Sequence, residues 1–233
     1  MPIIPASLIW AAAMAMTPES LPPIDGALLP VGDACYTVPA PEQGKFAGNI
    51  LRRVERLDAK RLMITVTSRF NEGPLLTSRI DVAFPSLRPI RTIEETDSKT
   101  DLSVRYRDGE ARGTVTGGDG RRQTSEVPLP GPVWDEETIE FVLTTLPLAE
   151  GAHFELPVFH FGRGSGVARI DVRRSISAEG FGGSPIAAWE IEGSTRSDMT
   201  ITFLVAKADR RLLAVEVGGV RSVLGGDCSR LTR

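Results

Sequence analysis

Along most of this chain, apolar and polar side chains alternate with a period of two, and no other feature limits the fold as strongly. In RLMITVTSRF, residues 61–70, Leu62, Ile64 and Val66 fall on one face of an extended strand and Thr65 falls on the other. Similar runs recur through most of the sequence. The pattern predicts about eight to ten antiparallel strands, each with one apolar face.

The segment LSVRYRDGEARGTV, residues 102–115, predicts a β-hairpin. A two-residue loop at 108–109 places Tyr106 opposite Ala111 and leaves Gly113 in the middle of the returning strand. A glycine at such a position marks a bulge or a close neighbour on that face. The small residues leave space either for a ligand or for a bulky side chain of the core.

Later parts of the chain continue the alternation. In VARIDVRRSIS, residues 167–177, the period places Ile170, Val172 and Ile176 together on one face. The runs DMTITFLVA and RLLAVEV flank the turn-forming residues KADR, and they predict another hairpin near the C-terminus.

One helix is predicted, over residues 135–146 of the segment WDEETIEFVLTTLP. Asp135 has the side chain of an N-cap, and the acidic residues that follow it suit the positive end of a helix dipole. An apolar stripe with helical spacing follows, made of Ile139, Val142, Leu143 and Leu146. Pro147 ends the helix. A short helix with one apolar stripe needs a surface to lie on, and the sheet supplies it.

The composition fits one large β domain. The chain has 233 residues, of which 41% are hydrophobic, so it can form a substantial core. Its formal net charge is −3, and it has no basic stripe of the kind that nucleic-acid-binding domains carry. We therefore expect no nucleic-acid partner, and a single β domain over residues 35–230.

The N-terminal residues 1–16, MPIIPASLIWAAAMAM, are apolar and end in small residues, as a secretory signal peptide does. Lys and Arg are absent from this run, so either the signal is weak or translation starts upstream. The run is too short for a membrane span, and we expect no integral membrane protein. The Pro-rich residues 17–34 predict a linker or an extended arm. A signal peptide would make the protein periplasmic or secreted.

Two cysteines, Cys35 and Cys228, lie near opposite ends of the predicted domain. In an oxidising compartment they would form a disulfide that encloses almost the whole domain. Otherwise they are two unrelated free thiols. Neither cysteine lies beside a histidine or a lysine in the sequence, which argues against a catalytic thiol.

The order of these features resembles the bacterial domain-of-unknown-function 3108 family. The resemblance runs from the YRDG hairpin through DEETIEFVLTTLPLAEG to VRRSISAEGFGGSPIAAWEIEG and the closing hairpin, over residues 33–228. It implies an exported envelope protein with a curved antiparallel sheet or half-barrel near a short helix, similar to lipocalin-like and lipoprotein-carrier folds. The family has no established activity and no catalytic residues to transfer. The EGFGGSP turn departs from the simpler turn of typical members.

Metal-ligating residue types gather in the stretch AHFELPVFHFGRGSG, which contains His153, Glu155 and His160. Two imidazoles and a carboxylate would suit Zn²⁺ with an open coordination position, as in a metal-dependent hydrolase. The spacing across Pro157 matches no known ligand signature, however, and the alternation also fits a half-buried strand. We therefore predict no metal.

Other motifs give no chemistry. GRGSG lacks the Lys-Ser/Thr ending of a phosphate loop and the first glycine of a nucleophile elbow. The acid-rich EETDSKTD, residues 94–101, fits a solvated loop and lacks the spacing of a calcium loop.

Taken together, the sequence predicts a mainly β, non-enzymatic protein with one short covering helix and no cofactor. We expect the concave apolar face of its sheet to bind or carry a lipid-like or other apolar molecule. Our candidates for lining residues are Tyr106, Phe141, Trp189 and Phe203. One alternative is a structural or interaction module with a packed interior and an envelope protein as partner, and another is a metal-dependent hydrolase.

Overall fold

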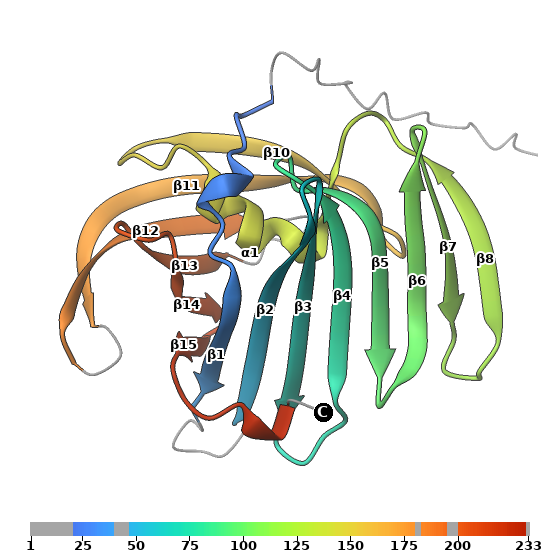
Figure 1. Cartoon of the computed structure of the whole chain (residues 1–233), viewed down its shortest axis with the longest axis horizontal. Helices are drawn as coiled ribbons and strands as arrows, with labels where there is room; N and C mark the ends of the chain where they lie inside the picture. Colours follow the sequence, from blue (N-terminus) through green and yellow to red (C-terminus); the bar gives the residue numbers. More distant parts are fainter. Residues whose placement is uncertain (1–20, 40–46, 180–182, 195–199, 232–233) are drawn as a thin grey trace, which may run out of the picture.

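The computed structural model of the chain describes residues 21–39, 47–179, 183–194 and 200–231. The predicted signal peptide, residues 1–16, lies outside them. In the described part, fifteen strands form one sheet that curves strongly and does not close into a barrel (Figure 1). The prediction of a curved, mainly antiparallel sheet is confirmed.

The strands follow one another across the sheet almost in chain order. They are β1 (Gly32–Val38), β2 (Gly48–Asp58), β3 (Arg61–Phe70), β4 (Leu76–Ala83), β5 (Arg88–Thr96), β6 (Lys99–Arg107), β7 (Glu110–Thr116), β8 (Arg122–Pro128), β9 (Trp134–Asp135), β10 (His153–His160), β11 (Gly164–Glu179), β12 (Pro185–Ser194), β13 (Ile201–Ala206), β14 (Leu212–Val217) and β15 (Val220–Leu224). Their order is β8-β7-β6-β5-β4-β3-β2-β1-β15-β14-β13-β12-β11-β10-β9. Among the described strands, β9 and β10 pair in parallel and the other neighbours are antiparallel.

The number of strands exceeds the prediction of about eight to ten. The additional strands include β8, which is exposed along nearly its whole length, and β9, which has two residues. Such strands carry no clear alternation of apolar and polar residues, so the period-two pattern cannot reveal them.

The curvature of the sheet buries a row of side chains that runs across its inner face. In register, this row is Val54, Ile64, Ile80, Thr92 and Val104, from β2 to β6. All five residues are buried, and the opposite wall adds side chains from β13 and β14 to the same apolar core. The sheet curls around its own apolar face because that burial removes apolar surface from water.

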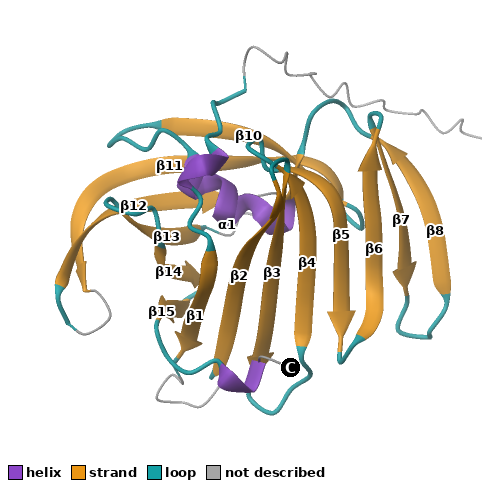
Figure 2. Cartoon of the chain, in the orientation of Figure 1, coloured by secondary structure: helices purple, strands orange, loops and turns teal. Residues whose placement is uncertain are grey.

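A helical segment, residues 136–145, lies inside the curve of the sheet (Figure 2). It consists of η3 (Glu136–Thr138), α1 (Ile139–Val142) and η4 (Leu143–Thr145), so most of it is 3₁₀-helix. Asp135 caps its start by accepting a hydrogen bond from the N–H of Glu137 at 3.0 Å. The four residues of the predicted apolar stripe are buried. The predicted covering helix is thereby confirmed.

Part of the predicted N-terminal arm packs against this segment. Residues 21–31 include a short 3₁₀-helix, η2 (Gly26–Leu28). The N–H of Asp25 donates to the carbonyl of Thr145 at 3.3 Å. Leu29 is buried in the main apolar core, so this stretch closes one end of the curve.

The long strand β11 changes faces at a bulge between Val172 and Arg174. Before the bulge, Ile170 and Val172 point into the main core. After it, Ile176 packs with Ala188 in a second apolar cluster on the other face of the sheet. The prediction that Ile176 shares a face with Val172 is wrong, because a bulge inserts one residue and reverses the alternation.

The hairpin over residues 102–115 forms in the predicted register, with Tyr106 opposite Ala111. The space above Gly113 is taken by the aromatic ring of Phe161, and a Cβ at position 113 would lie 2.8 Å from that ring. Of the two alternatives for this space, the structure shows the bulky core side chain.

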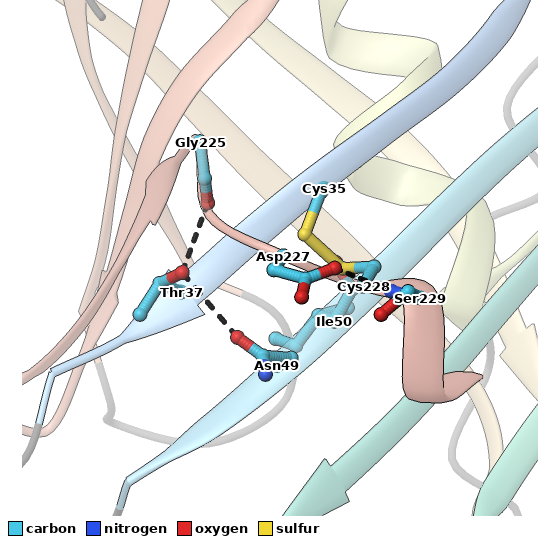
Figure 3. Close-up of a disulfide and its surroundings, with 8 residues drawn as sticks. All are labelled: Cys35, Thr37, Asn49, Ile50, Gly225, Asp227, Cys228 and Ser229. Atoms are coloured by element: carbon cyan, nitrogen blue, oxygen red, sulfur yellow. Dashed lines mark hydrogen bonds between the residues drawn. A yellow bond between two sulfur atoms is a disulfide. The ribbon is translucent and has the colours of Figure 1, made fainter.

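Cys35 and Cys228 form a disulfide, with their Cα atoms 5.7 Å apart. Figure 3 shows that it joins β1 to the residues after β15, beside the hydrogen bond that Thr37 Oγ1 donates to the carbonyl of Gly225 at 2.9 Å. Cys228 also packs against Leu51 of β2. It directly precedes the short 3₁₀-helix η5 (Ser229–Leu231). Of the two alternatives for the cysteines, the crosslink is the observed one, and it is compatible with export.

Replacing Gly113 with alanine should destabilise the fold by about 1–3 kcal/mol, because the new methyl group would force the Phe161 ring out of its place. Urea denaturation followed by circular dichroism measures the loss. Gly118→Ala, in the turn between β7 and β8, is the matched control, since a Cβ there meets nothing within 4 Å. Equal losses of stability in the two variants would contradict the close packing of Phe161 on Gly113.

Candidate functional site

A buried carboxylate, Asp135, connects the start of the helical segment to the far side of the curved sheet. Its Oδ2 accepts hydrogen bonds from Thr92 Oγ1 and from the Tyr106 hydroxyl, both at 2.6 Å. Its Oδ1 caps the helical segment at Glu137. Burial and the nearby carboxylate of Asp135 raise the pKa of Tyr106, so its hydroxyl stays protonated and donates. The short edge strand β9 is thus held against β5 and β6.

A second polar contact ties the helical segment to β2. Arg52 Nη2 lies 2.6 Å from Glu140 Oε2, and the guanidinium carbon of Arg52 lies 4.1 Å from the centre of the Tyr36 ring. The Tyr36 hydroxyl donates to the carbonyl of Leu212 at 2.8 Å. Burial raises the pKa of Glu140, and the charge of Arg52 opposes that rise. The pair therefore links the helical segment to β2 and, through Tyr36, to β14.

Beyond the buried row, the inner face of the sheet opens into a pocket of about 290 Å³, referred to here as the inner pocket. Its apolar walls are Ile50, Val66, Ile80, Ile139, Ile201, Phe203, Val215 and Val217. Its polar lining consists of Arg52, Ser68, Ser78, Glu136, Glu137 and Glu140. The walls come from β2–β4 on one side and from β13 and β14 on the other, with the helical segment between them.

The inner pocket exists because the helical segment is shorter than the strands that it covers. In Figure 1 the strands β2–β4 continue well beyond the helical segment. The row under the helical segment, which contains Ile64 and Ile80, is completely buried, whereas Val66 and Ser78 in the next row remain partly accessible. On the opposite wall, the same change occurs between Phe203 and Ile201.

One edge of the inner pocket is acidic. Glu94 lies directly opposite Ser78 in the register of β4 and β5. Carboxylate oxygens of Glu94 and Glu137 and a ring nitrogen of His160 all lie within 4.8 Å of one another. Two carboxylates and an imidazole are groups that Zn²⁺ accepts as ligands. Arg163 already supplies a positive charge there, because its Nη2 lies 3.8 Å from Glu137 Oε1.

The carboxylate of Glu137 has a raised pKa. Burial, together with the charges of Asp135, Glu94 and Glu140, raises its pKa from 4.5 to about 7, and Arg163 partly opposes the rise. Its side chain still keeps 40% of its surface accessible. A proton, a cation or a hydrogen-bond donor can therefore reach it from the inner pocket.

The four predicted lining residues do not share one site. Phe203 lines the inner pocket. Phe141 lies in the main core, beside a smaller pocket of about 100 Å³ near β1. Tyr106 belongs to the cluster around Phe161, and Lys207 Nζ lies 3.5 Å from the centre of the Trp189 ring.

The structure does not bring His153, Glu155 and His160 together. The two histidines occupy opposite ends of β10, seven residues or roughly 23 Å apart. His153 Nδ1 lies 2.7 Å from Asp171, and Glu155 pairs with Arg169 at 3.2 Å, both on the neighbouring strand β11. His160 instead lies beside Glu94 and Glu137, of which Glu137 lines the inner pocket.

Sequence reasoning missed Glu94 because it lies in the segment 94–101, which was predicted to be a solvated loop. That prediction is wrong: the segment forms the end of β5, a tight turn and the start of β6. Glu137 was placed in the first turn of the helix, but nothing in the sequence indicated that β5 and β10 converge on it. The only available signal in the sequence was that Glu94 is an acidic residue in a segment where polar and apolar residues alternate.

A larger hollow, of about 970 Å³, lies on the other face of the sheet under the β11–β12 hairpin. Apolar residues such as Ile176 and Leu204 share its lining with Glu179, Arg211 and Arg221. It adjoins the end of the hairpin that lies outside the described residues, so we assign the candidate site to the inner pocket.

Comparisons with known proteins identify a family but no activity. The model of DUF3108, a family described as proteins of unknown function, matches residues 28–218. No curated protein and no solved structure shows significant similarity to the chain. Among the described residues, no helix has the length and apolar character needed to cross a membrane.

Replacing Glu137 with glutamine should stabilise the protein at pH 8 and have little effect at pH 4. A carboxylate whose pKa is raised on folding costs stability once pH rises from its unfolded value of 4.5 through about 7, and glutamine removes that cost. Because the side chain is two-fifths exposed, we expect a gain of about 1–2 kcal/mol rather than the full effect of the shift.

Urea denaturation of both proteins at pH 4 and pH 8 measures this difference. Glu155→Gln, on the outer side of β10, is the control and should not stabilise the protein at pH 8. If Glu137→Gln changes the free energy of unfolding equally at both pH values, the pKa of Glu137 is not raised in the folded protein.

Proposed function

Since this chain belongs to the DUF3108 family, whose description names no activity, we propose its function from the geometry: it binds an apolar molecule in the inner pocket. The ligand would have one end that donates hydrogen bonds or carries a positive charge. This is a binding or carrier function rather than a catalytic one. We further propose that the protein acts in the periplasm or outside the cell, which the disulfide supports.

The observation that carries this proposal is the unfilled second row of the inner face. Apolar side chains from β2–β4, β13, β14 and the helical segment surround a space that no side chain of the described chain fills. Apolar walls with a few converging polar groups are typical of small-molecule sites. Apolar contact on both sides would release ordered water from Val66, Phe203 and their neighbours.

The size of the inner pocket limits the ligand. A volume of about 290 Å³ lies just below the range of about 300–1,000 Å³ for small-molecule sites. A single alkyl chain or a small ring system fits such a space, and a lipid with two acyl chains does not. The ligand class is therefore narrower than lipids in general.

The acidic edge favours a ligand whose polar end donates hydrogen bonds or carries a positive charge. Glu136, Glu137 and Glu140 line the inner pocket, and Arg52 pairs with Glu140. The accessible carboxylate of Glu137 can accept a hydrogen bond from an ammonium or a hydroxyl group. The three carboxyl groups outnumber the two nearby arginines, Arg52 and Arg163, so a carboxylate on the ligand would meet a surplus of acidic groups, which is unfavourable in a site of low dielectric constant.

The alternative of a packed structural module accounts for less of the structure. Under the helical segment the interior is packed, as that alternative requires, with Ile64 and Leu146 fully buried. In the next row the packing stops although the strands continue. A module without a ligand gives no reason for apolar residues such as Ile201 and Val217 to line an open space.

Binding of the apolar fluorophore N-phenyl-1-naphthylamine tests this proposal. We expect saturable fluorescence enhancement with the native protein, and at least tenfold weaker binding by Val66→Phe, whose ring would fill the inner pocket. Thr65→Phe is the matched control: it introduces the same ring at the next position of β3, on the opposite face, and should bind as the native protein does. Dodecylamine should displace the probe at lower concentration than dodecanoate.

The folded state of each variant is checked by its thermal unfolding curve. If Val66→Phe does not fold, Ile201→Phe fills the inner pocket from the opposite wall. Absence of saturable binding by the native protein, or equal binding by the filled and control variants, would contradict the proposed function.

A further inference from the structure

The strand β8 forms one free edge of the fifteen-stranded sheet (Figure 1). It pairs with β7 on one side, and six of its seven residues are exposed. A sheet edge carries unpaired N–H and C=O groups, which can pair with another strand. Two features of β8, the direction of its backbone groups and its charge pattern, indicate what that strand is.

The direction of the backbone groups follows from the register of β7 and β8. The N–H of Gly117 donates to the carbonyl of Arg121, and the N–H of Leu129 donates to the carbonyl of Gly109. Directly opposite residues in an antiparallel pair alternate between hydrogen-bonded and non-bonded pairs. The odd-numbered residues of β8 therefore bond to β7, and the even-numbered residues 122, 124 and 126 direct their N–H and C=O groups outward.

Pro128 agrees with this assignment. It is also even-numbered, so its nitrogen faces away from β7. A proline has no N–H, and at this position no carbonyl of β7 needs one as a donor. The outward edge available for pairing is therefore Arg122–Glu126.

We propose that this edge pairs with the same edge of a second copy of the chain, antiparallel about a two-fold axis at Thr124. In this register Thr124 lies opposite its own copy, and Arg122 of each chain lies opposite Glu126 of the other. Each of these pairs joins residues with outward backbone groups, so each can exchange two backbone hydrogen bonds. Opposite charges lie directly across the new strand boundary on both sides of the axis.

Other registers of the same edge lack this match. A shift that moves the axis to Arg122 places the two arginines opposite each other, and a shift toward the C-terminal end places Arg122 opposite Pro128. Glu126 is also close to a like charge within its own chain: its hydrogen bond and charge raise the pKa of Glu110. The partner's Arg122 would supply a positive charge beside that pair.

The charges also explain why a copy is favoured over an unrelated strand. Charged residues on an edge strand normally prevent pairing with other chains. In an antiparallel pair of two copies, the order Arg–Thr–Glu at 122, 124 and 126 places each arginine opposite a glutamate. A strand with another order of charges lacks this match, so the charges disfavour most other strands but not a second copy. A single pair of short strands buries less area than a permanent dimer needs, so we expect a weak, concentration-dependent dimer.

Sedimentation velocity of the full chain over a range of concentrations tests the proposal. We expect the sedimentation coefficient to rise with concentration toward that of a dimer. Thr124→Pro should abolish the rise, and it should leave the β7–β8 pairing intact because the N–H that it removes faces outward. The control is Arg221→Glu on β15, an exposed residue far from β8 in the sheet order.

A charge exchange gives the sharper test. Arg122→Glu and Glu126→Arg should each weaken the dimer at least tenfold, because each places like charges across the boundary. The double variant should restore it. A native chain that stays monomeric, a dimer that tolerates Thr124→Pro, single variants that match Arg221→Glu, or larger open-ended assemblies would overturn the proposal.

Discussion

The hydrogen bonds of Asp135 join the helical segment to two strands of the opposite part of the sheet. One buried carboxylate caps the helical segment and accepts hydroxyl hydrogen bonds from Thr92 on β5 and Tyr106 on β6. The strand β9 is the last strand in the pairing order, at the opposite end of the sheet from β8. Asp135 nevertheless holds β9 against β5 and β6. Together with the hydrogen bond that Trp134 Nε1 donates to the carbonyl of Ser86 at 3.1 Å, this connection keeps the two ends of the sheet curled around the helical segment.

The inner pocket is a consequence of this arrangement. Asp135 determines where the helical segment begins. The last residue of the segment is Thr145, and Leu146 and Pro147 follow it outside the helix, so the length of the segment is limited at both ends. Strands of eight to eleven residues extend past so short a cover. The first row of the inner face is buried, and the next row borders open space. The same geometry places Glu137, adjacent to the cap, at the polar edge of that space.

Local patterns in the sequence predicted the local structure well. The alternation in residues 61–70, the 108–109 turn and the cap at Asp135 each depend on neighbours within a few residues, and each is confirmed. The bulge after Val172 has no such signal, so the face of Ile176 was predicted wrongly. The acidic edge depends on Glu94 and His160 meeting across the curved sheet. No period or spacing in one sequence encodes that contact.

Hydrogen–deuterium exchange of Asp135→Asn, compared with the native protein, tests whether the hydrogen bonds of Asp135 hold the curved sheet around the helical segment. The substitution preserves the size of the side chain and replaces a carboxylate oxygen by an amide. If Asp135 holds β9 against β5 and β6, exchange should become faster both in the helical segment, residues 136–145, and in β5, β6 and β9, with little change in β13–β15. Faster exchange confined to the first turn of the helical segment, or spread evenly over all strands, would contradict this role of Asp135.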